Sequence, residues 1–111
     1  MIRKIIFYEN HFIDFYSAQN EKLKTKFQYV FELIRQVEMV PEKFLKNLSG
    51  HKGLYEIRIS YQSESYRIFC CFDEGKLVVL FNVFCKKSQK TPPIELEISD
   101  RLMKEYFSTK R

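Results

Sequence analysis

Three runs of strand-forming residues follow one another in residues 54–85, with no room for a helix between them. They are rich in β-branched and aromatic residues, and they cover Leu54–Tyr61, Ser65–Asp73 and Lys76–Cys85. Only Gln62-Ser63-Glu64 and Glu74-Gly75 separate them, and connections this short join antiparallel neighbours. The sequence therefore predicts an antiparallel meander, to which the rest of the chain must be fitted.

The first half of the chain predicts one strand and a helical hairpin. Residues 3–8 read as a short strand, followed by a helix near residues 11–18 and a longer one from about residue 21 to 38. Apolar residues recur in the longer helix at the spacing of one buried stripe, namely Leu23, Phe27, Val30, Phe31, Ile34 and Val37. Pro41 ends this pattern, and residues 42–53 read as a basic connector.

A helix is also expected at the C-terminal end, because Thr91-Pro92-Pro93 is a typical helix start. Ile94, Ile98, Leu102 and Tyr106 then recur every four residues. The order is βααβββα, which predicts an α+β fold with a mainly antiparallel sheet and helices packed on one face. At 111 residues and 13.5 kDa, we expect residues 1–111 to form a single domain.

Composition excludes several classes of protein. No apolar run approaches the roughly 20 residues of a membrane span, and the N-terminal residues do not resemble a signal peptide, so we expect a cytoplasmic protein with no membrane partner. Cys70, Cys71 and Cys85 lack metal-site spacing and read as buried free thiols. We also find no glycine-rich phosphate loop, nucleophile elbow or paired carboxylates, and we expect neither metal nor cofactor.

The net charge of +5 is concentrated in the middle of the chain. Residues 43–92 contain nine Lys and Arg against four Asp and Glu, whereas the flanking segments are balanced. A concentrated excess of this kind attracts polyanions, and the sequence shows no basic amphipathic helix that would favour a membrane surface. Nucleic acid is therefore the favoured partner.

Alternation along the meander separates a core side from a mixed side. The core side holds Tyr55, Ile57, Ile59, Tyr66, Ile68, Cys70, Phe72, Leu77, Val79, Phe81 and Val83. The mixed side holds Glu56, Arg58, Arg67, Phe69, Cys71, Val78, Leu80, Asn82, Phe84 and Lys86. Tight turns would place Arg58 opposite Arg67, and Arg67 opposite Asn82 and diagonal to Phe84.

Two arginines facing each other are unfavourable on an ordinary surface, because like charges directly opposite destabilise a sheet. The arrangement is explained if a phosphate sits between them and bases stack on the neighbouring rings. The alternative is that Glu56 bridges both arginines on a solvated face. The pattern alone leaves both interpretations open.

Basic residues also surround the end of the meander and its beginning. Lys86, Lys87 and Lys90 precede the last helix, where a helix N-terminus adds to their attraction for anions. His51 and Lys52 lie in the connector before the first strand, where His51 could reach a substrate. Solvated loops are the alternative interpretation of both segments.

The motifs combine into a resemblance to the HigB-like branch of the RelE/ParE toxins of type II toxin-antitoxin systems. They are residues 53–59 (GLYEIRI), 66–69 (YRIF), 80–84 (LFNVF) and 86–92 (KKSQKTP), in the order and spacing of that family. The βααβββα order extends the resemblance to nearly the whole chain, which implies a RelE-like fold.

The resemblance implies a metal-independent mRNA endoribonuclease, in many members acting only on the ribosome, that inhibits translation and is neutralised by a helix-turn-helix, HigA-like antitoxin. Arg58, Arg67 and Lys86 would be catalytic, with the two arginines holding the scissile phosphate and Glu56 orienting them. The other RNA-binding residues would be Phe69, Asn82, Phe84, Lys87, Lys90, His51 and Lys52.

Other activities remain open for a protein of this kind. RNA supplies its own nucleophile, the 2′-hydroxyl, so a nuclease needs to align it, move protons and stabilise charge. Phe84 and Cys85 stand where some relatives carry a Tyr or His, and Tyr106 is the remaining candidate in the C-terminal segment, so the general base is not identified. A ParE-like inhibitor of DNA gyrase without nuclease activity and a non-catalytic RNA-binding module are the alternatives.

Overall fold

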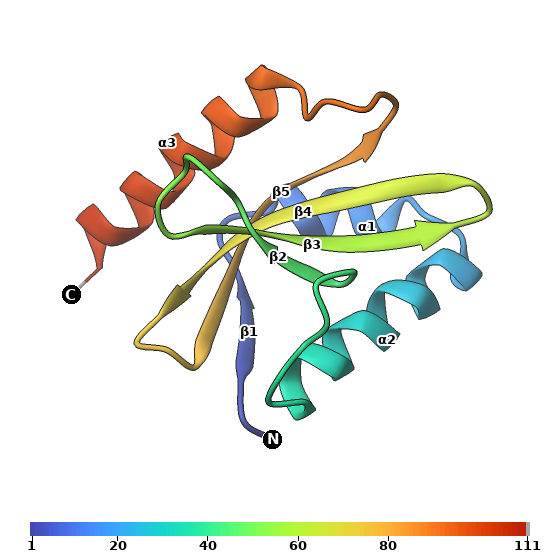
Figure 1. Ribbon diagram of the computed structural model, residues 1–111, viewed down its shortest axis with the longest axis horizontal. Helices are drawn as coiled ribbons and strands as arrows, with labels where there is room; N and C mark the ends of the chain where they lie inside the picture. The colour runs from blue at the N-terminus through green and yellow to red at the C-terminus, as the bar shows by residue number, and fades with distance from the viewer. Residues whose placement is uncertain (111) are drawn as a thin grey trace.

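The computed structural model describes residues 1–110, which form a five-stranded mixed sheet and three helices (Figure 1). The elements are β1 (Lys4–Phe7), α1 (His11–Ser17), α2 (Glu21–Gln36), β2 (Leu45–Asn47), β3 (Leu54–Tyr61), β4 (Glu64–Asp73), β5 (Leu77–Lys86) and α3 (Pro93–Thr109). The strand order is β1-β5-β4-β3-β2, in which β1 runs parallel to β5 and the other pairs are antiparallel. The predicted α+β class, with a mainly antiparallel sheet, is confirmed.

The helical hairpin covers one face of the sheet with its predicted apolar stripe. The Asn20 side chain accepts a hydrogen bond of 2.9 Å from the Leu23 backbone N–H and so caps the start of α2. Phe27, Val30 and Phe31 of this helix are fully buried against the sheet. At about 2 kcal/mol for each large apolar side chain removed from water, this stripe is a major part of the driving force for folding.

The expectation that all helices pack on one face is wrong. Helix α3 lies on the opposite side of the sheet from α2, as Figure 1 shows, and its Leu102 is fully buried against Phe69 and Phe81. The sheet therefore has two apolar faces, each with its own core. The mixed side of the predicted meander carries no pattern that indicates a covering helix, but α3 packs on the apolar part of it.

The β3–β4 hairpin confirms that Arg58 lies opposite Arg67. Gln62 and Ser63 form a two-residue turn with positive φ values of 49° and 68°, the geometry of a type I′ hairpin turn. Tyr61 therefore pairs with Glu64, and the register follows along both strands.

The register of β4 on β5 differs from the prediction. Asp73 pairs with Leu77 rather than with Lys76, and a register shift between Ile68 and Cys70 adds one residue on the β5 side. As a result Arg67 lies opposite Phe84 instead of Asn82.

The turn at residues 74–76, one residue longer than expected, exchanges the faces of the first part of β5. Val83 packs toward the helical hairpin as predicted, but Leu77, Val79 and Phe81 pack toward α3. Val78 and Leu80 lie on the hairpin side instead of on the mixed side. One more residue in the turn reverses the alternation in the part of the strand that follows, and the extra residue at the bulge restores the predicted face at Val83.

Strand β2 lies inside the segment expected to be only a connector. Its three residues pair with Tyr55–Ile57 of β3, and the Arg58 backbone N–H donates a 2.8 Å hydrogen bond to the Phe44 carbonyl. Three residues of the type Leu-Lys-Asn give too short a pattern for a strand to be recognised. Beyond Arg58, β3 forms the edge of the sheet.

Candidate functional site

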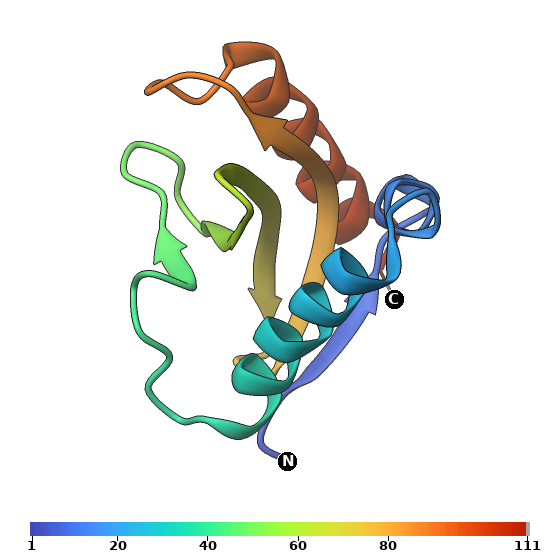
Figure 2. The same cartoon turned by 90° about the vertical axis from the view of Figure 1, so that its right-hand side faces the viewer.

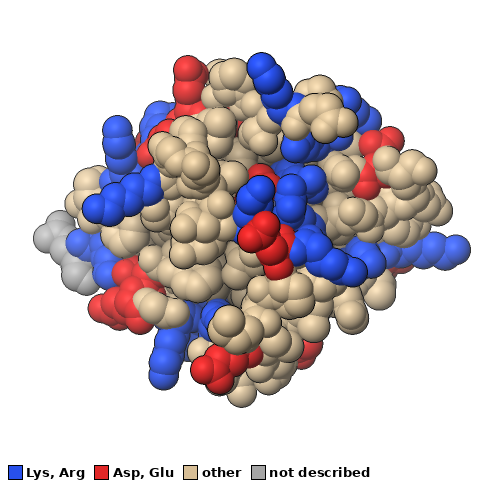
Figure 3. All heavy atoms as spheres, in the orientation of Figure 1, with Lys and Arg blue, Asp and Glu red and all other residues tan. Residues whose placement is uncertain are grey.

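The predicted arginine pair lies on the α3 side of the sheet, beyond the part that α3 covers. Arg58 of β3 and Arg67 of β4 face each other, and the Glu56 carboxylate lies between their side chains. The distances to Glu56 Oε1 are 3.1 Å from Arg58 Nε and 3.7 Å from Arg67 Nε. On the side of the molecule that Figure 3 shows, Lys and Arg side chains gather near the centre, with acidic side chains among them.

Arg58, Arg67 and Glu56 do not satisfy all of one another's hydrogen-bonding groups. Glu56 Oε2 and the Nε atoms of Arg58 and Arg67 are buried, and none of them has a hydrogen-bond partner among the described residues. The short contacts to Glu56 therefore have ion-pair distance without good hydrogen-bond alignment. Buried polar atoms normally find partners, so this cluster has unused capacity to bind a polar group.

Burial sets the electrostatics of Arg67, whose side chain is 11% exposed compared with 28% for Arg58. Desolvation is the largest cause that lowers the pKa of Arg67, and the nearby Arg58 cation lowers it further, while Glu56 opposes both. A guanidinium remains charged near neutral pH despite such a shift. The site therefore holds two cations beside one carboxylate.

Lys86 lies beside Arg67 at the end of β5. It pairs with Ser65 of β4, and both residues line a hollow of about 410 Å³ together with Arg67. Lys87, Ser88 and Gln89 complete the lining. The sequence prediction did not include Ser65, although its place two residues before Arg67 on the same strand puts it on the same face.

The loop that follows Lys86 is basic, but its lysines differ. Lys87 Nζ donates a 3.2 Å hydrogen bond to Glu64, and this carboxylate raises the pKa of Lys87. A lysine with a raised pKa binds anions but is a poor general base near neutral pH. Lys90 is exposed and lies further along the same loop.

Three of the predicted RNA-binding residues need correction. Phe69 is completely buried and Phe84 is 7% exposed, since their rings pack on each other and on the core beneath α3. Neither ring is available to stack on a base. Asn82 is also buried, and its Nδ2 donates to the backbone carbonyl and the Oε1 of Glu95, at 3.0 and 2.9 Å. It therefore ties β5 to the start of α3.

The connector and the basic loop project from the same side of the molecule. Figure 2 shows residues 48–53 in green and 87–92 in orange at this side. His51 Nδ1 lies 3.4 Å from Asp100 Oδ2 of α3, and this pair is ionic only when the histidine is protonated. Lys52 beside it is exposed. No pattern in the sequence indicates the Asp100 contact, because it depends on where α3 packs.

Other side chains that could act as an acid, a base or a nucleophile are hydrogen-bonded to a carboxylate or buried. Tyr106 donates a 2.7 Å hydrogen bond to Asp73, and burial together with this carboxylate raises the pKa of Tyr106 to about 12. Burial raises the pKa of Cys71 to about 12 and the pKa of Cys70 well above its usual value. Cys85, which is half-buried, donates to Glu64 at 3.1 Å, and burial raises the pKa of its thiol. None of these groups is suited to proton abstraction near pH 7.

Among residues 1–110, no group of three or more His, Cys, Asp or Glu side chains could hold a metal ion. Within the same range, no helix is both long and apolar enough to cross a membrane.

The fold and its cationic face define the class of protein. The strand order, with a helical pair on one face and a terminal helix on the other, matches a RelE-like α+β arrangement. Residues 14–104, more than half of the chain, match the family described as Phage derived protein Gp49-like (DUF891). The chain belongs to this family of phage-derived proteins, which is related to RelE/ParE-type toxins. None of the curated proteins matches the chain.

Family membership associates the chain with the toxins of toxin-antitoxin systems. A toxin of this kind has an antitoxin as its partner. The activity of the toxin has to be argued from the site.

Proposed function

We propose that this protein is a HigB-like toxin that cuts mRNA on the ribosome, in the cytoplasm, and is neutralised by a helix-turn-helix antitoxin. The observation that carries the proposal is the pair of opposed, partly buried arginines with a single carboxylate between them. Two guanidinium groups in this arrangement match the geometry and charge of a phosphodiester.

The proposed reaction uses the 2′-hydroxyl of the RNA as the nucleophile. Its oxygen attacks the adjacent phosphorus, the bond to the 5′-oxygen breaks, and the products end in a 2′,3′-cyclic phosphate and a 5′-hydroxyl. One proton leaves the 2′-hydroxyl and another is delivered to the departing 5′-oxygen. No metal ion is needed for these steps.

Arg58 and Arg67 would stabilise the negative charge that accumulates on the phosphate in the transition state. Low exposure strengthens this effect at Arg67, because water competes less for the guanidinium. Lys86 would bind the same or the next phosphate from the adjoining hollow.

Glu56 would orient the two guanidinium groups through its Oε1. Its Oε2 has no hydrogen-bond partner among the described residues, which makes this oxygen the best placed proton acceptor beside the arginines. The raised pKa values of Lys87, Tyr106 and Cys85 argue against those groups in that role.

The proposal is tested by incubating the purified protein with programmed ribosomes and mapping the 5′ ends of the mRNA. New ends inside the message are expected. Arg67→Ala should reduce turnover by about 10²-fold or more while weakening binding much less, as expected for a group that acts in the transition state. If the parent leaves the message intact and Arg67→Ala only weakens RNA binding and its salt dependence, the protein is a binding module instead. Intact message together with inhibited DNA supercoiling by gyrase would support a gyrase inhibitor.

A further inference from the structure

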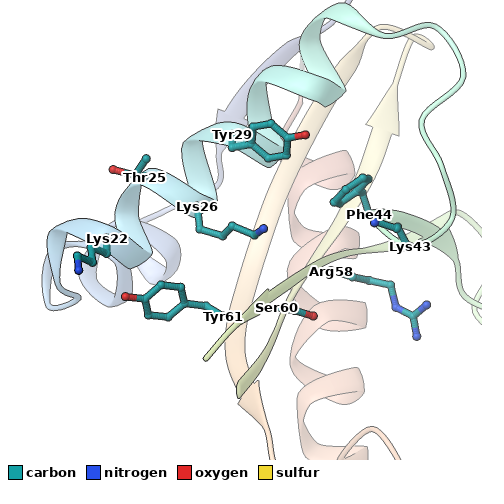
Figure 4. Close-up of a pocket in the computed structure, with 9 residues that line it drawn as sticks. All are labelled: Lys22, Thr25, Lys26, Tyr29, Lys43, Phe44, Arg58, Ser60 and Tyr61. Carbon is teal, nitrogen blue, oxygen red and sulfur yellow. The ribbon is translucent and has the colours of Figure 1, made fainter. Parts of the chain in front are cut away.

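A further groove in the described part of the chain lies beside the arginine site and shares Arg58 with it. This groove, of about 730 Å³, runs between α2 and the outer edge of β3 (Figure 4). Its lining contains the cations Lys22, Lys26, Lys43 and Arg58, and it contains no acidic side chain. We refer to it as the α2–β3 groove.

The three lysines of the α2–β3 groove are not neutralised by nearby acids. Lys22, Lys26 and Lys43 form no ion pair within residues 1–110, whereas Lys24, on the same helix, lies 3.4 Å from Glu21. Figure 4 shows the Lys26 side chain reaching into the space between α2 and β3. Three unpaired charges around one groove make a local attraction for a polyanion.

Aromatic rings accompany these charges. Tyr29 is 55% exposed and packs edge-on against Phe44, with 6.4 Å between ring centroids. Lys26 lies 5.7 Å from the Tyr29 ring, and Lys43 lies 5.0 Å from the Phe44 ring. Exposed rings among cations are the usual features of grooves that bind single-stranded nucleic acid.

An added peptide strand fits this groove less well. The Arg58 backbone N–H faces the outer edge of β3 and is already bonded to Phe44. Backbone groups face the same edge at every second residue of a strand, so Ser60 is the next residue that could bond to an added peptide. The turn at Gln62 and Ser63 ends β3 soon afterwards. An extended peptide would therefore gain few ladder hydrogen bonds, whereas a polyanion can use all the cations.

Arg58 connects the groove with the arginine pair. The aliphatic part of its side chain lines the groove, and its guanidinium points away from the lysines (Figure 4). At that end Nε lies 3.1 Å from Glu56. A strand lying in the groove would thus reach the arginine pair by crossing the edge of β3.

We propose that the α2–β3 groove binds the single-stranded RNA that flanks the phosphate held by Arg58 and Arg67. This inference rests on the proposed function, because it gives the path of the same substrate. Lys22, Lys26 and Lys43 contact the RNA backbone, and Tyr29 offers a surface on which a base stacks. The groove sets affinity and the length of RNA that is covered, and the arginines act on one phosphate.

The test measures binding of a 2′-O-methylated oligouridine, about 12 nucleotides long, to the full chain by fluorescence anisotropy at several salt concentrations. This probe has no free 2′-hydroxyl and cannot be cut by the proposed reaction. The groove variant is Lys22→Ala/Lys26→Ala/Lys43→Ala. The matched control is Lys4→Ala/Lys76→Ala/Lys104→Ala, which removes three exposed lysines that lie outside the groove.

We expect the groove variant to bind more weakly and to lower the slope of log K against log salt by about 2, since each phosphate contact on a single strand contributes about 0.7. The control should lower the slope by much less. Equal effects of the two variants would overturn the inference, because they would reflect net charge alone. Selective loss of binding to poly-L-glutamate, with RNA binding unchanged, would also overturn it and would indicate an acidic protein segment as the occupant.

The result can be separated from the fate of the proposed function. If the groove variant alone loses affinity in a protein that leaves mRNA intact, the groove assignment stands and the nuclease assignment fails. If Arg67 is needed for cleavage but both variants bind the oligonucleotide alike, the groove assignment fails by itself. Thermal melting of both variants checks that the fold is retained.

Discussion

Arg67 combines features that an ordinary surface arginine lacks. Its side chain is 11% exposed, it faces Arg58, and its Nε has no hydrogen-bond partner in the described protein. Placing like charges opposite each other costs up to about 1 kcal/mol. Glu56 offsets this repulsion only in part, and a bound phosphate would remove it.

Removing the Glu56 carboxylate should expose the repulsion between the arginines. We expect Glu56→Ala to lower the free energy of unfolding by about 2 kcal/mol, less than for a fully buried ion pair because Arg58 is 28% exposed. Glu56→Gln should fall between the parent and Glu56→Ala. Urea unfolding followed by circular dichroism measures both changes.

A double variant provides the control for this prediction. Adding Arg58→Ala to Glu56→Ala removes the uncompensated cation and should recover part of the lost stability. If Glu56→Ala is as stable as the parent, or if the second substitution adds a full independent loss, the two arginines do not repel each other as described.

Sequence reasoning succeeded at the residues whose position depends on local geometry. The opposition of Arg58 and Arg67 follows from the turn at Gln62 and Ser63, a few residues away. It failed for Phe69 and Asn82, because burial of those side chains depends on α3, which is distant in the sequence. Alternation shows which residues share a face, but not what covers that face.

At the scale of the elements, the β4–β5 bulge and the start of α3 together position the basic loop. The bulge places Phe84 beside Arg67 and leaves Lys86 at the end of the strand, next to the arginine. Asn82 then holds the first turn of α3 through Glu95. Residues 87–92 are thus fixed at both ends.

Asn82→Ala should loosen this loop without removing any group proposed to touch RNA. Losing the two hydrogen bonds to Glu95 should cost about 1–3 kcal/mol of stability. Amide hydrogen exchange in residues 87–95 should become faster, and cleavage should slow because Lys86 and Lys87 are held less firmly. Ser108→Ala, on the exposed end of the same helix, should change neither property. Unchanged exchange in residues 87–95 would contradict the anchoring role.

The helices and long strands were predictable because each carries a pattern many residues long. Helix α2 shows its apolar stripe over four turns, and β3 shows alternation over eight residues. Strand β2 and the bulge have no such pattern, since each results from pairing with a neighbouring strand. Errors in the predicted faces of β5 followed from the turn at residues 74–76, which is one residue longer than expected.

At the scale of the whole molecule, the last turns of α3 are held to the sheet by a polar cluster. Asp73 of β4 lies 2.7 Å from Lys110 Nζ and accepts a 2.7 Å hydrogen bond from Tyr106. These contacts, that with Lys110 first, lower the pKa of Asp73 below its usual value of 3.8. The cluster joins the C-terminal segment to the strand that carries Arg67.

This pKa shift predicts how stability depends on pH. Because the pKa of Asp73 is lower in the folded than in the unfolded state, its contribution is fully present above the usual pKa and is lost as the pH falls through the folded value. Asp73→Asn should therefore lower the melting temperature at pH 7, and the difference from the parent should shrink below about pH 4. Calorimetry at pH 7, 5 and 3 measures it, with Asp14→Asn, which forms no ion pair in the described part, as the control. A difference that stays constant down to pH 3 would show that the ionised carboxylate is not what stabilises α3.

In the proposed reaction, the arginine face holds a phosphate while the adjacent 2′-hydroxyl of the RNA attacks it. The most direct measurement replaces the nucleotide before the mapped cut by its 2′-deoxy form in an otherwise unchanged message on the ribosome. Cleavage at that position should be abolished, and the unmodified message should yield a 2′,3′-cyclic phosphate and a 5′-hydroxyl. Cleavage that persists at the deoxynucleotide would contradict the account, because the attacking oxygen would then have to come from elsewhere.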